Sequence, residues 1–143
     1  MVKSRLFSLL VMLLAFCGLK AQTVNVKRYT NLPAIYIETF NKVSITSKET
    51  YVYATMWYVD ENDSVTRYDS LQIRGRGNST WGLRKKPYRL KFQSKEKFLG
   101  KGYAKAKSWT LLANAGDKTL IRNAVTSAMG EFMGMKFNPA YKF

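Results

Sequence analysis

Residues 51–68 read YVYATMWYVDENDSVTRY, and this stretch decides the class of fold. Residues 51–60 are rich in tyrosine, valine, threonine and tryptophan, which are residue types favoured in strands. The four polar residues at 60–63 favour a turn, and residues 65–68 return to a strand-type composition. The stretch therefore predicts a β-hairpin.

Further strands are predicted on both sides of this hairpin. In residues 34–40, Ile35 and Ile37 alternate with polar positions directly after a proline. Residues 71–74 predict another short strand, and residues 108–113 predict a buried one. The chain is therefore expected to form an antiparallel β-rich layer.

Residues 87–92 predict a strand with two different faces. Tyr88, Leu90 and Phe92 alternate with Arg89 and Lys91. Because side chains alternate across a strand, one face should pack in the core and the other should present positive charge.

The one convincing helix is predicted after residue 117. Asp117 is a suitable N-cap, residues 118–133 form the helix, and Gly134 ends it. Gly130 indicates close packing against a strand. The apolar stripe consists of Leu120, Ile121, Ala124, Val125, Ala128, Met129, Phe132 and Met133. The predicted fold class is α+β, with an N-terminal antiparallel β-rich layer followed by one amphipathic helix.

The first 21 residues are typical of a signal peptide. Lys3 and Arg5 precede an apolar run over residues 6–17, and Ala21 suits cleavage. The run is shorter than the roughly 20 residues that a membrane span needs. We expect residues 1–21 to be removed and residues 22–143 to be exported, as a secreted, periplasmic or cell-surface protein. Lipidation at Cys17, the only cysteine, stays open as an alternative.

The charge of the chain is strongly positive and uneven. The formal net charge is +15, and the stretch from Arg74 to Lys107 holds 12 basic residues against one acidic residue, Glu96. Such a concentrated field attracts anionic partners. For the lysines at 95, 97, 101, 105 and 107, a solvated, solubilising surface is the alternative interpretation.

Several kinds of catalytic site are excluded by composition. The chain has no histidine, and its nine acidic residues are scattered without the spacing of a carboxylate pair or a metal clamp. The glycine-rich residues 75–80 fit neither the Walker pattern nor GxGxxG, because Thr80 replaces the third glycine. Taken alone, this loop is equally explained as a turn between two strands.

The glycine-rich loop is the first of four sequence motifs that occur in a fixed order and together indicate a family. Residues 74–81 read RGRGNSTW, residues 85–92 KKPYRLKF, residues 108–114 SWTLLAN and residues 117–123 DKTLIRN. This set resembles the CotH kinase family, named for spore coat protein H, over residues 32–139. The resemblance covers only the first part of the family domain, so the chain is expected to be the N-terminal portion of an atypical protein-kinase-like fold.

The resemblance implies an atypical protein kinase with ATP as phosphoryl donor and Mg²⁺ or Mn²⁺ as cofactor. Its implied partners are a nucleotide and a protein acceptor that the sequence does not identify, with no membrane span and no nucleic acid. No catalytic residue is assigned, and Asp117 is open to two interpretations, as a helix cap or as a metal ligand. The expected ATP- and phosphate-binding residues are Arg74, Arg76, Asn78, Ser79, Lys86, Arg89 and Lys91.

Three outcomes are therefore open for the chain as given. It binds nucleotide phosphates but does not transfer phosphoryl groups by itself, because phosphoryl transfer needs metal ions held by carboxylates. Alternatively it is a basic, exported β-rich module that binds an anionic polymer or glycan, with Tyr51, Tyr53, Trp57 and Trp81 as stacking surfaces. The third possibility is an inert fragment that does not fold alone.

Overall fold

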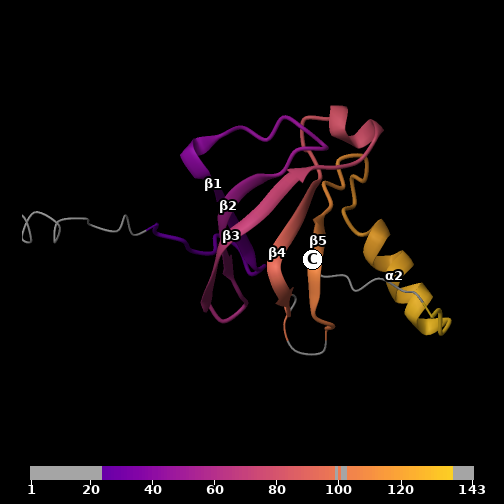
Figure 1. Ribbon diagram of the computed structural model, residues 1–143. Helices are drawn as coiled ribbons and strands as arrows, with labels where there is room; N and C mark the ends of the chain where they lie inside the picture. The colour runs from indigo at the N-terminus through magenta and orange to yellow at the C-terminus, as the bar shows by residue number, and fades with distance from the viewer. Residues whose placement is uncertain (1–23, 99, 101–102, 137–143) are drawn as a thin grey trace, which may run out of the picture.

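The computed structural model describes residues 24–98, 100 and 103–136 (Figure 1). The expected signal peptide and Cys17 lie outside these residues. The elements, in chain order, are β1 (Ala34–Thr39), the 3-10 helix η2 (Phe40–Lys42), β2 (Val52–Val59), β3 (Val65–Gly75), the 3-10 helix η3 (Ser79–Gly82), β4 (Tyr88–Glu96), β5 (Ala106–Leu111) and α2 (Arg122–Phe132).

The strands form one antiparallel sheet in the order β1-β2-β3-β4-β5, so each strand pairs with the next one along the chain. With α2 following the sheet, the fold is α+β, as predicted. None of the helices in the described part of the chain has the length and apolar character of a membrane span.

The predicted hairpin is confirmed as β2 and β3. Its turn is closed by Asp60, whose carboxylate accepts hydrogen bonds from the amides of Asn62 and Ser64 at 2.8 and 2.9 Å. Asp63, with a φ of 60°, also forms an ion pair with Arg28 at 2.6 Å. The polar residues at 60–63 therefore make the turn, and one of them fastens the segment before β1.

One prediction wrongly divided a single strand into two. Residues 65–68 and 71–74 belong to the single strand β3 and not to two strands. The pairing of β2 with β3 shifts between Ala54 and Met56, and Ser70 has a φ of 55°. This irregularity is a β-bulge, which absorbs an extra residue while the strand continues.

The core lies on one face of the sheet. Its buried cluster consists of Ala54, Met56, Leu71, Ile73, Leu90, Phe92 and Phe98. Leu90 and Phe92 in β4 are buried while Arg89 and Lys91 are exposed, so the two-faced strand predicted at 87–92 is confirmed. The face opposite this core carries the polar and charged side chains of the central strands.

Residues 108–113 were predicted to form a buried strand, and the predicted burial was wrong. The strand is β5, Ala106–Leu111, and it contains no fully buried residue. It forms one edge of the sheet, and Figure 1 shows α2 lying beyond that edge and not across it. Trp109 and Leu111 of β5 pack at the border of the core and stay partly buried, whereas Lys107, Ser108 and Thr110 are exposed.

The helix begins later than predicted. The prediction placed its start at residue 118, but α2 begins at Arg122 because residues 118–120 form a turn in which Leu120 has a φ of 61°. Its end is as predicted. Gly134, with a φ of 67°, donates to the carbonyl of Glu131 and Met135 donates to that of Gly130, both at 3.0 Å. These two bonds form a Schellman motif.

The apolar stripe of α2 faces outward. Val125, Met129 and Phe132 are 49%, 58% and 94% exposed, whereas Gly130 is buried. The buried side of α2 therefore carries a small residue. The large apolar side chains on the other side of the helix are not covered by any described residues.

Candidate functional site

The strongest cluster of predicted site residues lies on the polar face of β3 and β4. Arg74 is directly opposite Arg89, and Gln72 is opposite Lys91. Directly opposite residues of an antiparallel pair share a face. The intervening pair of Ile73 and Leu90 belongs to the core, so the two arginines and Lys91 project from the other face.

An aromatic ring gathers two of these cations. The guanidinium of Arg74 lies 5.1 Å from the centre of the Tyr51 ring, and the Lys91 Nζ lies 5.6 Å from it. Both distances fit cation–π contacts. We call Tyr51, Arg74, Arg89 and Lys91 the cationic face.

The cations of this face have no acidic partner. Among the described residues, Arg74, Arg89 and Lys91 form no ion pair. The Nε atom of Arg74 is buried and has no hydrogen-bond partner. A guanidinium carries five N–H donors, so the remaining donors of Arg74 are suited to an anion that reaches the sheet from solvent.

The glycine loop after β3 is built around Trp81. A Cβ on Gly75 would lie within 2.8 Å of three atoms of the indole ring, so the ring occupies the space that a side chain would need. Trp81 also packs edge-on against Tyr88, with ring centres 6.1 Å apart. Gly77 has a φ of 91°, which favours glycine. These contacts give both glycines a structural role in the turn between β3 and β4.

Lys86 belongs to the same packing unit. Its Nζ donates to the carbonyl of Trp81 at 2.6 Å and lies 4.7 Å from the centre of the indole. The other expected phosphate-binding residues of the loop, Arg76, Asn78 and Ser79, are exposed. The structure thus brings Arg74, Arg89 and Lys91 together, places Arg76, Asn78 and Ser79 on the loop that follows β3, and engages Lys86 with Trp81.

Asp117 is not the N-cap of α2 as predicted, because Ile121 occupies that position, but its side chain holds the turn before the helix. Its carboxylate accepts hydrogen bonds from the Thr119 hydroxyl at 2.6 Å, the Thr119 amide at 3.1 Å and the Arg122 amide at 2.9 Å. The Thr119 hydroxyl and these amides hold the pKa of the carboxyl below its ordinary value, against the opposing effect of burial. Asp117 therefore stabilises the turn and the first amide of α2.

The fit of the described residues to a divalent metal is poor. They contain no group of three His, Cys, Asp or Glu side chains that could hold a metal ion. The oxygens of Asp117 are engaged by Thr119 and Arg122, and its carboxylate is only 10% exposed. These residues therefore do not fit the Mg²⁺ or Mn²⁺ that the resemblance implies.

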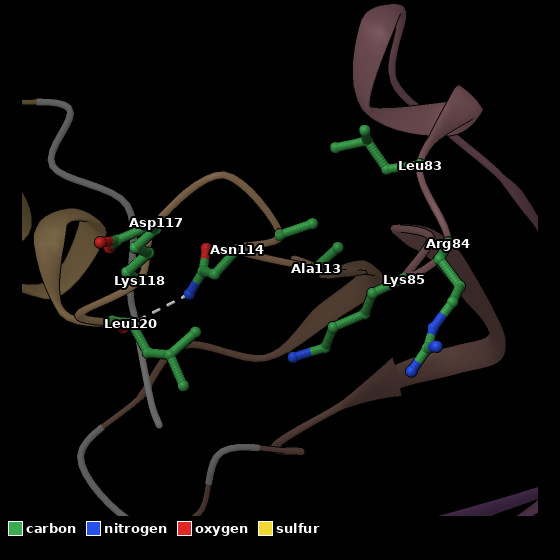
Figure 2. Close-up of a pocket in the computed structure, with 9 residues that line it drawn as sticks. Leu83, Arg84, Lys85, Ala113, Asn114, Asp117, Lys118 and Leu120 are labelled. Atoms are coloured by element: carbon green, nitrogen blue, oxygen red, sulfur yellow. Dashed lines mark hydrogen bonds between the residues drawn. The ribbon is translucent and has the colours of Figure 1, made fainter.

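A pocket of about 460 Å³ lies at the end of the sheet where β4 begins and β5 ends. Figure 2 shows the Lys85 side chain extending across it toward Asn114 and Leu120. Sequence reasoning did not assign this pocket, because its walls come from segments far apart in the chain. Its lining consists of Leu83, Arg84, Lys85, Ala113, Asn114, Ala115, Asp117, Lys118 and Leu120.

Comparison with protein families gave a match to a kinase family. The family described as CotH kinase protein matches residues 73–143. The matched region includes β4, β5 and α2, three of the four residues of the cationic face, and the whole pocket lining. Comparisons with curated proteins and with solved structures gave no match.

Proposed function

Because the chain belongs to the CotH kinase family over residues 73–143, we propose that it is the nucleotide-binding part of an exported, ATP-dependent protein kinase. The cationic face binds the phosphates of ATP. The observation that carries this proposal is the direct pairing of Arg74 with Arg89, beside Lys91, since none of these cations forms an ion pair with another described residue.

The chemistry of phosphoryl transfer supports the assignment. The reaction relies on positioning and electrostatic stabilisation of a highly charged group, so cations held by a rigid framework are what it requires. Arg74 and Arg89 project from paired strands, and Tyr51 lies against Arg74 and Lys91. Guanidinium groups bind phosphate oxygens through two parallel hydrogen bonds, which adds directional preference to the attraction.

We further propose that residues 22–143 alone do not transfer phosphoryl groups. Mg²⁺ or Mn²⁺ would neutralise the charge that develops on the transferring group. The described carboxylates do not fit such an ion, and the oxygens of Asp117 are engaged by Thr119 and by the amide of Arg122. In this proposal the chain holds a nucleotide weakly, and the acceptor protein remains to be identified.

Nucleotide binding is tested by titrating the purified chain with ATP and following the heat of binding. Arg89→Ala and Lys91→Ala should each weaken binding by at least about tenfold, since a hydrogen bond to a charged group contributes roughly 1.5–3 kcal/mol. Lys105→Ala is the matched control, because Lys105 is exposed and lies outside the cationic face. Equal losses for all three variants would mean diffuse attraction and would refute a defined site.

Transfer is tested with labelled ATP, Mg²⁺ or Mn²⁺ and a generic protein acceptor. We expect no transfer above a control without protein. Label incorporation that Asp117→Ala abolishes would show that Asp117 is catalytic and that holding the turn before α2 is not its only role.

The export proposal rests on the charged and apolar order of the first 21 residues. The intact mass of the exported protein should correspond to a chain that begins at Gln22. A product that retains Met1, or one that carries lipid on Cys17, would contradict it.

A second candidate function is binding of an anionic polymer or glycan. It is favoured by Tyr53, which is 51% exposed on the polar face, and by Trp57, whose ring lies 5.7 Å from the guanidinium of Arg67. Tyr53→Ala should then weaken binding of an acidic polysaccharide and leave ATP binding unchanged, whereas an effect on ATP alone would favour the kinase assignment.

A further inference from the structure

We propose that the pocket between the η3–β4 loop and the turn before α2 binds a protein segment through an acidic side chain that is followed by an apolar one. This site is separate from the cationic face, since the pocket lining includes none of Tyr51, Arg74, Arg89 and Lys91. Nothing in the nucleotide proposal requires it.

The positive charge of the pocket lining indicates that the ligand carries an acidic group. Arg84, Lys85 and Lys118 line the pocket, and none of them forms a hydrogen bond or an ion pair with another described residue. The only acidic side chain in the lining is Asp117. Its oxygens accept hydrogen bonds from Thr119 and from the amide of Arg122, and its charge is shared with the Arg122 guanidinium at 3.4 Å, so it offsets at most one of the three cations. A carboxylate or a phosphate in the pocket would supply the missing negative charge.

The apolar part of the pocket lining indicates that the ligand also carries an apolar side chain. Leu83 and Leu120 are 41% and 50% exposed, and Ala113 and Ala115 also line the pocket. In Figure 2 the Lys85 side chain extends toward Leu120, so cationic and apolar groups share one space. An anion with an apolar neighbour uses both kinds of group, whereas a fully hydrated anion uses only one.

A protein segment fits the surroundings better than a small molecule does. Leu120 lies in the turn directly before α2, and the outward apolar side chains of α2 include Val125 and Met129, both about half exposed. A ligand anchored in the pocket can therefore extend along the helix and cover apolar surface. Extended apolar surface of this kind typically marks a protein-binding site.

The test uses short fluorescent peptides and the purified chain. One peptide carries a Glu-Leu pair in a Gly/Ser background, and the others replace this pair by Gln-Leu, Glu-Ser or phosphoserine-Leu. Fluorescence anisotropy should show binding of the Glu-Leu peptide, and about tenfold weaker binding of the Gln-Leu peptide, because its neutral amide removes a charge-assisted contact. The phosphoserine arm shows whether carboxylate or phosphate is the preferred anion.

Variants of the chain then locate the site. Lys85→Gln should weaken binding of the Glu-Leu peptide about tenfold, while Lys105→Gln should leave it within about twofold. Leu120→Ser should weaken binding of Glu-Leu and leave Glu-Ser unchanged. Equal effects of Lys85→Gln and Lys105→Gln, indifference to Leu120→Ser, or displacement of the peptide by ATP would each overturn the proposal. Failure of ATP to bind at all would refute the nucleotide assignment and leave the peptide result intact.

Discussion

Replacing Gly75 by alanine tests how the glycine loop is held. The new Cβ would overlap the indole of Trp81, with three ring atoms within 2.8 Å. The backbone at Gly75 is not in the left-handed region, so alanine brings no conformational strain of its own. The indole must therefore move, and it must leave its contacts with Tyr88 and Lys86.

The expected loss follows from those contacts. An edge-to-face aromatic pair contributes about 0.5–1.5 kcal/mol and an exposed cation–π contact about 0.5–1 kcal/mol. Gly75→Ala should therefore lower the free energy of unfolding by about 1–2.5 kcal/mol, within the range typical of overpacking. In a chain that already carries Trp81→Ala, the clash is gone. There the same substitution should be neutral or stabilising by about 0.4–1 kcal/mol, because alanine restricts the unfolded chain.

The assay is urea unfolding followed by far-UV circular dichroism, which does not depend on the tryptophan that is removed. The four proteins of the double-mutant cycle are the parent chain, the two single variants and the double variant. We expect a coupling free energy of about 2 kcal/mol between the two positions. Additive effects within about 0.5 kcal/mol would refute the packing of Trp81 on Gly75.

Three further predictions concern stability. The pKa of Asp117 is lowered in the folded protein, so its ionised carboxylate stabilises the fold above the unfolded pKa, and this stabilisation is lost as the pH falls through the folded pKa. When the pH is lowered below about 4, the Asp117→Asn variant should therefore lose less free energy of unfolding than the parent chain, as measured by urea unfolding at several pH values. Leu90→Ala should lower the free energy of unfolding by about 2–5 kcal/mol, since Leu90 is fully buried, and a smaller loss in the same assay would mean that the sheet core is loosely packed. Gly134→Ala should destabilise α2 by about 1 kcal/mol because of the positive φ, whereas Gly116→Ala, which has neither a positive φ nor a close neighbour, should be neutral by circular dichroism.

The sequence predicted the strands wherever alternation was regular. Ile35 and Ile37 in β1, and Leu90 and Phe92 in β4, follow the period of two that a half-buried strand imposes. The bulge in β3 was missed because Asp69 and Ser70 are turn-forming residues that interrupt this period. Burial of β5 was overestimated, since the apolar residues Trp109 and Leu111 alone cannot show whether another layer covers the strand.

The candidate site was predictable only in part. Alternation placed Arg89 and Lys91 on one face, but the pairing of Arg74 with Arg89 depends on the register of β3 and β4, which no local pattern specifies. The late start of α2 follows from the positive φ of Leu120, a residue type for which that conformation is unfavourable. Residues of the pocket are brought together by tertiary structure, so spacing along the chain carried no signal for Lys85 beside Leu120.

The pairing of Arg74 with Arg89 also bears on how the sheet itself assembles. Like charges directly opposite each other on neighbouring strands destabilise their pairing by up to about 1 kcal/mol, and Lys91 adds a third positive charge nearby. The pairing of β4 with β3 therefore includes an unfavourable electrostatic repulsion between these cations. Dissolved salt weakens this repulsion by screening the charges. Added electrolyte should accordingly raise the melting temperature of this protein, the opposite of its effect on a fold that depends on exposed ion pairs.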